Sequence, residues 1–276
     1  MGLTNEIGIM QGRLSPRIAG KIQAYPANTW QKEFKIAQEI GYAAIEWIVE
    51  KPVETNALMT DSGKAEIKKV IVSTGVRIDY VCADIFMQQP LVRMTEETKS
   101  QNKEYLASIL KNAKEVGAIG VEIPFVDNSS IKNETEKQEF IDVMQDAFKL
   151  AKNLDMKISL ETDLPPLAFK ELLEHINLNY IQANYDIGNS ASLGFDPNEE
   201  LEAYGDKILN VHVKDRKLGG TTVPLGTGSA DIQGVFQKLN EIGYTGGITM
   251  QAARGENDIN IANEQLSYTL EIIENL

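Results

Sequence analysis

Cysteine and histidine are scarce in this chain, and long apolar runs are absent. The single cysteine, Cys82, excludes an intramolecular disulfide and is compatible with a reducing compartment. Because the residues around it have strand character, we interpret Cys82 as a buried small hydrophobe rather than a nucleophile. No apolar run reaches the ~18 residues of a membrane span, and the first residues lack the basic and then apolar pattern of a signal peptide. We therefore expect a cytoplasmic protein that does not cross a membrane.

Basic residues are also outnumbered. The chain has 27 Lys and Arg residues against 40 Asp and Glu residues, which gives a net charge of −13. Such a field repels the phosphates of nucleic acids, whose binding depends on clusters of Lys and Arg. The charge balance therefore predicts a protein with no nucleic-acid partner. The 42% hydrophobic content over 276 residues is ordinary for a globular protein and is sufficient for a core.

Short β-rich runs alternate with longer amphipathic helical runs along the whole chain. The predicted strands cover residues 7–10, 43–48, 78–83, 120–125, 157–160, 181–185, 208–213 and 247–250. The predicted helices begin near residue 29, lie around 64–73, cover 96–116 and 140–154, begin near residues 165 and 197, and cover 231–242 and 264–273. This alternation implies parallel strands with right-handed crossovers. Eight such units predict an α/β fold with one (β/α)8 TIM barrel domain over residues 1–276.

Polar residues stand at the ends of the last four predicted strands: Glu161 after KISL, Asp186 after QANY, His212 in LNVHVKD and Gln251 after GITM. Functional residues of a TIM barrel lie at the C-terminal ends of its strands, where neighbouring side chains can reach one ion. Two carboxylates, an imidazole and an amide oxygen suit Mn²⁺, which we expect first, and also Mg²⁺, Co²⁺ or Zn²⁺. Taken alone, Glu161 and Asp186 are more often helix caps or loop residues than ligands, and His212 is more often a core histidine. The prediction of one divalent metal ion therefore depends on the four occurring together.

Basic residues follow several strands at the same end of the barrel: Arg13, Lys214, Arg216 and Arg254. They indicate an anionic or polyhydroxyl substrate. With the glycine-rich loop 226–228, Arg216 and Arg254 predict a phosphate site, because loops after strands seven and eight bind phosphate in many TIM barrels. The alternative is that the loop only makes a tight turn and that Asp231 caps the next helix.

Seven segments spread over nearly the whole chain carry a resemblance to a known family: IGIMQGRLSP (7–16), VCADIFMQQP (81–90), VEIPFVDNSS (121–130), SLETDLPP (159–166), NYDIGNSASLGFDP (184–197), NVHVKDRKLGGTTVPLGTGSAD (210–231) and ITMQAARG (248–255). The chain resembles the xylose isomerase-like TIM barrels, and within them the sugar phosphate isomerase/epimerase group. The resemblance implies metal ligands at Glu161, Asp186 and His212. In the ketose epimerases the fourth ligand is a glutamate that also transfers a proton, whereas this chain has Gln251. The epimerases also carry a histidine where this chain has Asn189.

The resemblance implies a metal-dependent isomerase or epimerase that acts on a sugar or sugar phosphate through an enediolate. An amide cannot accept a proton at ordinary pH, so Gln251 leaves Glu161 as the candidate catalytic base and favours an aldose–ketose isomerase. Epimerisation needs a second acid/base group, for which Asp215 and Glu46 are candidates. The predicted substrate-binding residues are Arg13, Glu46, Asn189, Lys214, Asp215, Arg216 and Arg254.

Two other functions stay open: a metal-dependent dehydratase of a sugar derivative, and a sugar-binding barrel without catalytic activity. The DNA-repair endonucleases of the superfamily are a poor match, because they use a histidine-rich site with three zinc ions. This chain has two histidines, and His175 is predicted on a helix surface.

Overall fold

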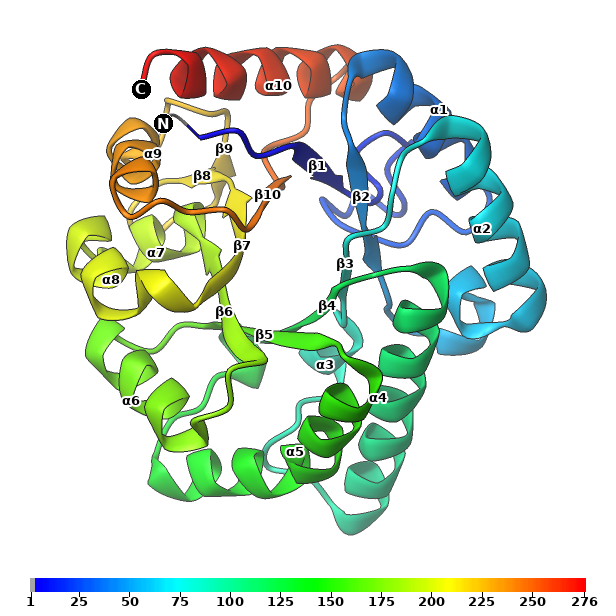
Figure 1. The fold of residues 1–276 in the computed structure, drawn as a ribbon, viewed down its shortest axis with the longest axis vertical. Helices are drawn as coiled ribbons and strands as arrows, with labels where there is room; N and C mark the ends of the chain where they lie inside the picture. The colour runs from blue at the N-terminus through cyan, green and yellow to red at the C-terminus, as the bar shows by residue number, and fades with distance from the viewer. Residues whose placement is uncertain (1–2) are drawn as a thin grey trace.

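Strands and helices alternate along the computed structural model, which describes residues 3–276. The barrel strands are β1 (Ile7–Met10), β2 (Ala44–Ile48), β3 (Tyr80–Cys82), β4 (Gly120–Phe125), β5 (Lys157–Thr162), β6 (Ile181–Asp186), β7 (Ile208–Val213) and β10 (Gly247–Met250). They are all parallel and close in the order β1-β10-β7-β6-β5-β4-β3-β2. Figure 1 shows this ring of strands with the helices around it. The predicted (β/α)8 barrel is confirmed.

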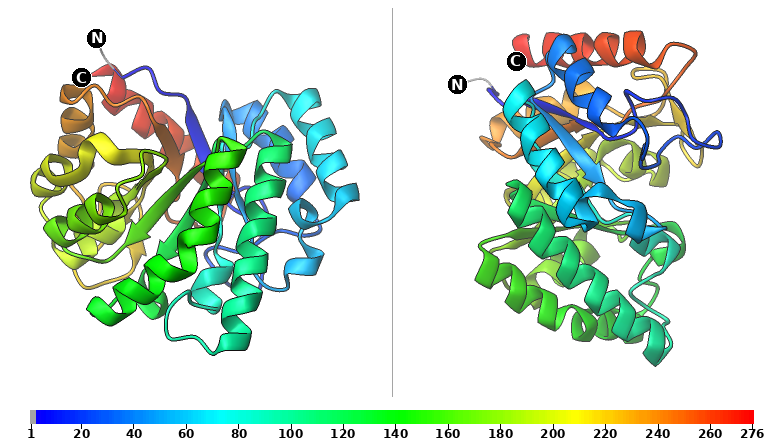
Figure 2. Two further views of the ribbon diagram at one scale, coloured as in Figure 1. Left: turned by 60° about the horizontal axis from the view of Figure 1, so that its bottom comes forward. Right: turned by 90° about the vertical axis from the view of Figure 1, so that its right-hand side faces the viewer.

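Eight longer helices of the described chain lie outside the barrel (Figures 1 and 2). They are α1 (Trp30–Ile40), α2 (Asp61–Thr74), α4 (Glu96–Val116), α5 (Glu134–Leu154), α6 (Pro166–Ile176), α8 (Pro197–Tyr204), α9 (Ile232–Glu241) and α10 (Asp258–Glu274). Two of them begin about six residues before their predicted start. In α5 the side chain of Asn133 accepts a hydrogen bond from the Glu136 N–H at 3.0 Å, and Asn257 caps α10 in the same way. These caps satisfy N–H groups of the first turn and so set the start of each helix.

Short elements that the sequence did not predict occupy several loops, most of them at the C-terminal ends of the strands. They are α3 (Ile85–Gln88), α7 (Ile187–Leu193), the 3₁₀ turns η1 (Val53–Thr55), η2 (Ala57–Met59), η3 (Asp127–Ser129) and η4 (Gly205–Lys207), and an antiparallel pair of β8 (Asp215–Arg216) and β9 (Thr222–Val223). The pair shapes the loop after β7. Because these elements are shorter than the ~11–18 residues over which a helical repeat can be recognised, periodicity does not reveal them.

Apolar side chains fill the layer between the strands and the helices. Trp47 of β2 is fully buried and packs against Tyr25, Trp30 and Phe34, with ring centroids 5.6, 5.2 and 6.4 Å away. Its indole N–H donates to Asn56 Oδ1 at 2.9 Å. Since Trp30 and Phe34 belong to α1, this cluster anchors α1 to the barrel wall. In residues 3–276 no helix is both long and apolar enough to cross a membrane.

The inside of the barrel is polar toward the C-terminal ends of its strands. Five side chains there belong to residues no more than 2% exposed: Glu46, Glu122, Asn184, Asn210 and His212. Buried polar groups destabilise a fold unless they find hydrogen-bond partners or a ligand. Their concentration at one end of the barrel marks the place where a functional site belongs.

Candidate metal centre and active site

Three of the four predicted metal ligands lie together at the C-terminal mouth of the barrel. Glu161, Asp186 and His212 end β5, β6 and β7, and each offers one ligand atom within 4.8 Å of the others. All three residues are buried. The oxygen Oδ2 of Asp186 lies 2.5 Å from the ammonium of Lys214, so a metal ion that uses this oxygen has to compete with Lys214. The donor set and its spacing suit one divalent cation.

His212 is fixed from both sides of its ring. Its Nε2 lies 3.0 Å from Glu46 Oε2, and the amide nitrogen of Asn184 lies 3.1 Å from its Nδ1. With Nε2–H donating to Glu46, the protonated ring can also donate from Nδ1 to Glu161 Oε2, which is 3.3 Å away, and loss of that proton would expose a lone pair for a metal ion. A carboxylate behind a histidine is the usual support of a metal-binding imidazole. Burial lowers the pKa of His212, but the charges of Glu46 and Glu161 outweigh it and raise the pKa well above its ordinary value.

The carboxylate of Glu161 is held by one amide on each oxygen. Asn184 Nδ2 donates to Oε2 at 2.9 Å, and Asn189 Nδ2 donates to Oε1 at 2.7 Å. Arg216 Nη1 donates to the amide oxygen of Asn189 at 2.8 Å and so orients that amide. Burial raises the pKa of Glu161, but the hydrogen bond and charge of His212 dominate, and the pKa lies below its ordinary value. Glu161 is therefore an ionised carboxylate in a fixed orientation.

The fourth predicted ligand, Gln251, is connected to Asp186 through the side chain of Lys214. The ammonium of Lys214 lies 2.5 Å from Asp186 Oδ2 and donates to Gln251 Oε1 at 2.8 Å. The close approach depends on Gly188, since a Cβ there would lie 2.9 Å from Lys214 Cγ and 3.0 Å from its carbonyl oxygen. Burial raises the pKa of Asp186, and Lys214 opposes that rise. The ammonium thus pairs with a carboxylate that a divalent ion would also use.

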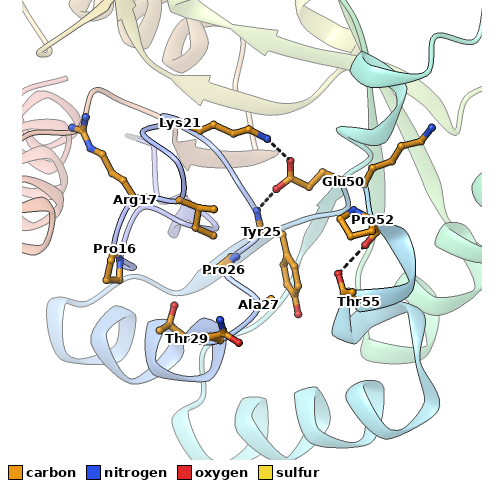
Figure 3. Close-up of a pocket in the computed structure, with 13 residues that line it drawn as sticks. Pro16, Arg17, Lys21, Tyr25, Pro26, Ala27, Thr29, Glu50, Pro52 and Thr55 are labelled. Atoms are coloured by element: carbon orange, nitrogen blue, oxygen red, sulfur yellow. Dashed lines mark hydrogen bonds and ion pairs between the residues drawn. The ribbon is translucent and has the colours of Figure 1, made fainter.

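A cavity of about 270 Å³ opens above this group. Six of the predicted site residues line it: Arg13, Glu161, Asn189, Lys214, Arg216 and Gln251. Burial, together with the charge of Arg254, lowers the pKa of Arg13 to about 10. A larger groove of about 440 Å³ is lined by the loop after β1 and by residues 50–52 and Thr55 (Figure 3). It contains none of the predicted residues, and its Lys21 is paired with Glu50. We therefore place the active site in the smaller cavity.

Three predicted substrate-binding residues lie outside the cavity lining. Glu46 lies beneath His212, where it also accepts from Asn210 Nδ2 at 2.9 Å. Asp215 accepts from the N–H groups of Gly228 and Ala230 at 2.8 and 3.1 Å, so it holds the glycine-rich loop. Arg254 binds Asp258 at 2.7 Å and the carbonyl oxygen of Ser15.

Protein groups therefore bind several donors of the phosphate site predicted around the loop 226–228, and that site stays a prediction. Asp231 caps α9, as the alternative interpretation held. Arg216 reaches the cavity, but its Nε and Nη2 donate to the carbonyl oxygen of Gly220.

Several cavity residues were missed by the sequence reasoning. The most prominent are Glu122 of β4, Cys82 of β3, and Asp84 and Asp127 in the loops that follow these strands. In β4, Pro124 pairs with Glu161, and Glu122 lies two residues before Pro124. A prediction that considers only strand ends therefore overlooks Glu122. The alternation of inward and outward side chains along β4 was the signal that could have revealed it.

The fold and the site define a class of protein: a TIM barrel with a buried group of potential metal ligands at the C-terminal ends of its strands. The family model named xylose isomerase-like TIM barrel matches residues 34–272, and the chain belongs to this family.

Known proteins of similar sequence and structure agree. L-ribulose-5-phosphate 3-epimerase UlaE of Escherichia coli (strain ATCC 8739) is 27% identical over 235 residues, which cover 81% of this chain and 82% of that protein. Among solved structures, a D-tagatose 3-epimerase-like protein has a TM-score of 0.76 at 20% identity, and the IolI protein with a bound zinc atom has 0.79 at 15%. Each alignment covers 98% of both chains. At these identities the structural matches support the fold.

Proposed function

We propose that this protein is a divalent-metal-dependent isomerase or epimerase of a small sugar or sugar phosphate. The observation that carries the proposal is the buried group of Glu161, Asp186 and His212, in which Glu161 is ionised and oriented. The cavity of about 270 Å³ is close to the lower end of the ~300–1,000 Å³ of small-molecule sites, and it suits a sugar of five or six carbons. The named activity of the similar epimerase supports the same substrate class.

Glu161 would act as the general base. Its two amide partners, Asn184 and Asn189, hold the carboxylate in one orientation, and each oxygen keeps a lone pair for a proton from the carbon next to a substrate carbonyl. A divalent ion held by Glu161, Asp186, His212 and Gln251 would polarise that carbonyl and offset the charge of the enediolate. Mn²⁺ is our first choice of ion, with Mg²⁺, Co²⁺ and Zn²⁺ as alternatives; a zinc atom is bound in the similar IolI structure.

The route of the returning proton separates isomerase from epimerase. A single base can move a proton between adjacent carbons on one face of the enediolate, and Glu161 is sufficient for that. An epimerase returns the proton to the opposite face, where Gln251 has no acid. Neither Glu46 nor Asp215 lines the cavity, because their carboxylates are engaged with His212 and with the loop amides. The geometry therefore favours the one-base isomerase, while the similar epimerase supports the alternative.

Deuterium exchange tests the proposal. The purified protein is stripped of metal, reloaded with Mn²⁺ and incubated in D₂O with L-ribulose 5-phosphate and, separately, with D-tagatose. Deuterium at carbon 2 of an aldose product, or at carbon 1 of the recovered ketose, indicates an isomerase, and deuterium at carbon 3 of an epimeric ketose indicates an epimerase. Sugar binding without exchange indicates a binding barrel, and loss of water from the sugar indicates a dehydratase. The matched control is Glu161→Gln, which keeps an amide oxygen and lacks the proton acceptor.

A further inference from the structure

Glu122 is a buried carboxyl group that the proposed reaction does not use. It belongs to β4, pairs in register with Cys82 of β3 and Ser159 of β5, and is 1% exposed. Two residues later along β4, Pro124 pairs with Glu161. Glu122 therefore lies one inward-facing position deeper in the barrel than the base, and it forms part of the cavity wall.

Both carboxyl oxygens of Glu122 lack a hydrogen-bond partner within residues 3–276, and so does the hydroxyl of Ser159. No ion pair of the described chain includes Glu122. Leaving a buried polar group unpaired costs about 1–3 kcal/mol, so an unpaired carboxyl group at a cavity wall indicates a partner supplied by a ligand. The neighbouring Cys82 is at most a weak donor, and burial raises its pKa.

The chemistry of that ligand group follows from the surroundings of Glu122. Burial raises the pKa of Glu122 well above its ordinary value, and the charge of Glu161 adds to the effect. A protonated carboxyl group has one donor and several acceptor positions, which is the complement of an alcohol. A phosphate or carboxylate is not expected here, because the basic residues of the cavity wall are Arg13, Lys214 and Arg216, and none of them is paired with Glu122.

We propose that Glu122 is a sugar-binding residue that hydrogen-bonds a hydroxyl group of the substrate at the deep end of the cavity. This inference rests on the proposed function for the class of substrate. The inference also predicts the orientation of the substrate. An anionic group of the substrate would lie toward the basic residues of the cavity wall, and the uncharged polyol part would lie toward Glu122. The carbonyl and its neighbouring carbons would then lie between them, beside Glu161.

Binding of an unreactive probe tests the inference separately from catalysis. The probe is ribitol 5-phosphate, which has the hydroxyl groups and phosphate of a pentulose phosphate and no carbonyl. Its affinity for the Mn²⁺-loaded protein is measured by calorimetry for wild type, Glu122→Gln and Glu122→Leu. The glutamine keeps a donor and an acceptor, so its affinity should stay within about threefold. The leucine has a similar size and no polar atom, so its affinity should fall about 10- to 100-fold, as expected for one lost hydrogen bond to a hydroxyl.

A further measurement separates recognition from a structural role. A set of probe analogues is made, each lacking one hydroxyl group. The analogue that lacks the hydroxyl bound by Glu122 should bind wild type more weakly than the full probe does. In Glu122→Leu this analogue and the full probe should bind with the same affinity. Mn²⁺ affinity should be the same in all three proteins. Equal probe affinity in Glu122→Leu and wild type would overturn the inference. If the leucine variant does not fold, wild-type binding that is insensitive to every deoxy analogue would overturn it as well.

The two proposals can fail independently. A protein that binds ribitol 5-phosphate through Glu122 and yet exchanges no deuterium would refute the proposed reaction and leave this inference standing. A protein that turns over its substrate while Glu122→Leu binds the probe normally would do the reverse.

Discussion

Replacing Lys214 with methionine should tighten the binding of Mn²⁺. The ammonium of Lys214 lies 2.5 Å from Asp186 Oδ2 and 2.8 Å from Gln251 Oε1. A divalent ion that uses these oxygens has to displace it, because a divalent ion and an ammonium about 4 Å apart repel by about 8 kcal/mol at an effective dielectric constant of ~20. Methionine has a similar length and no charge, so it removes the competing partner.

The size of the effect follows from the contacts that Lys214 gives up. The side chains of Lys214 and Asp186 are 12% and 1% exposed, so solvent screens their pairing only weakly. A hydrogen bond to a charged group contributes about 1.5–3 kcal/mol, and about 1.4 kcal/mol corresponds to a tenfold change in affinity. Lys214→Met should therefore raise the affinity for Mn²⁺ about 10- to 100-fold. Titration of free Mn²⁺ by electron paramagnetic resonance measures this directly and requires no turnover.

Two further variants make the measurement decisive. Lys217→Met removes an exposed positive charge from the same loop and should change the affinity less than about twofold, because exposed charges are screened. Gly188→Ala keeps the charge of Lys214 but crowds its side chain, with a Cβ 2.9 Å from Lys214 Cγ, and should also tighten binding. If Lys214→Met binds Mn²⁺ with the wild-type affinity or more weakly, Lys214 does not compete with the metal and the reasoning is refuted.

Proton abstraction, metal affinity and pH-dependent stability can each be probed by one further substitution. Glu161→Gln should still bind Mn²⁺, while deuterium exchange falls about 10²–10⁴-fold; full activity with metal bound would show that Glu161 is only a ligand. Gln251→Glu should tighten Mn²⁺ binding and introduce exchange at carbon 3 of a ketose, and NMR that shows neither would remove Gln251 from the ligand set. Glu46→Leu should weaken Mn²⁺ binding about 10- to 100-fold through the lost support of His212, and an unchanged titration would contradict this. Burial raises the pKa of Glu33 from 4.5 to about 7, so its contribution to stability is greatest below pH 4.5 and declines as pH rises to about 7, by about 3 kcal/mol. Urea unfolding at about pH 5 and 8 should show a smaller difference for Glu33→Gln than for wild type, and equal differences would argue against a titrating Glu33.

The barrel and its three buried candidate metal ligands could be predicted from the order of residues alone. Four strands, β1, β4, β7 and β10, begin and end where the sequence predicted, and so does α4. Strands buried on both faces are nearly continuous apolar runs, and helices of the outer layer have one apolar face. The eight strand–helix units can therefore be recognised from the sequence pattern. The strand ends then follow, and parallel closure alone brings Glu161, Asp186 and His212 together.

Which polar side chains reach the cavity depends on the tertiary structure. Arg254 and Asp215 follow strand ends as Glu161 does, yet Asp258 binds the first and the loop amides bind the second. Conversely, the positions of Glu122 and Lys214 matter because of strands that are distant in sequence. Glu122 lies beside β5, and the ammonium of Lys214 pairs with Asp186 at the end of β6. A side chain's partners depend on the positions of atoms from several strands and on the competition among donors and acceptors there. Sequence periodicity predicts single helices and strands, so it does not reveal which donors and acceptors from different strands pair with one another.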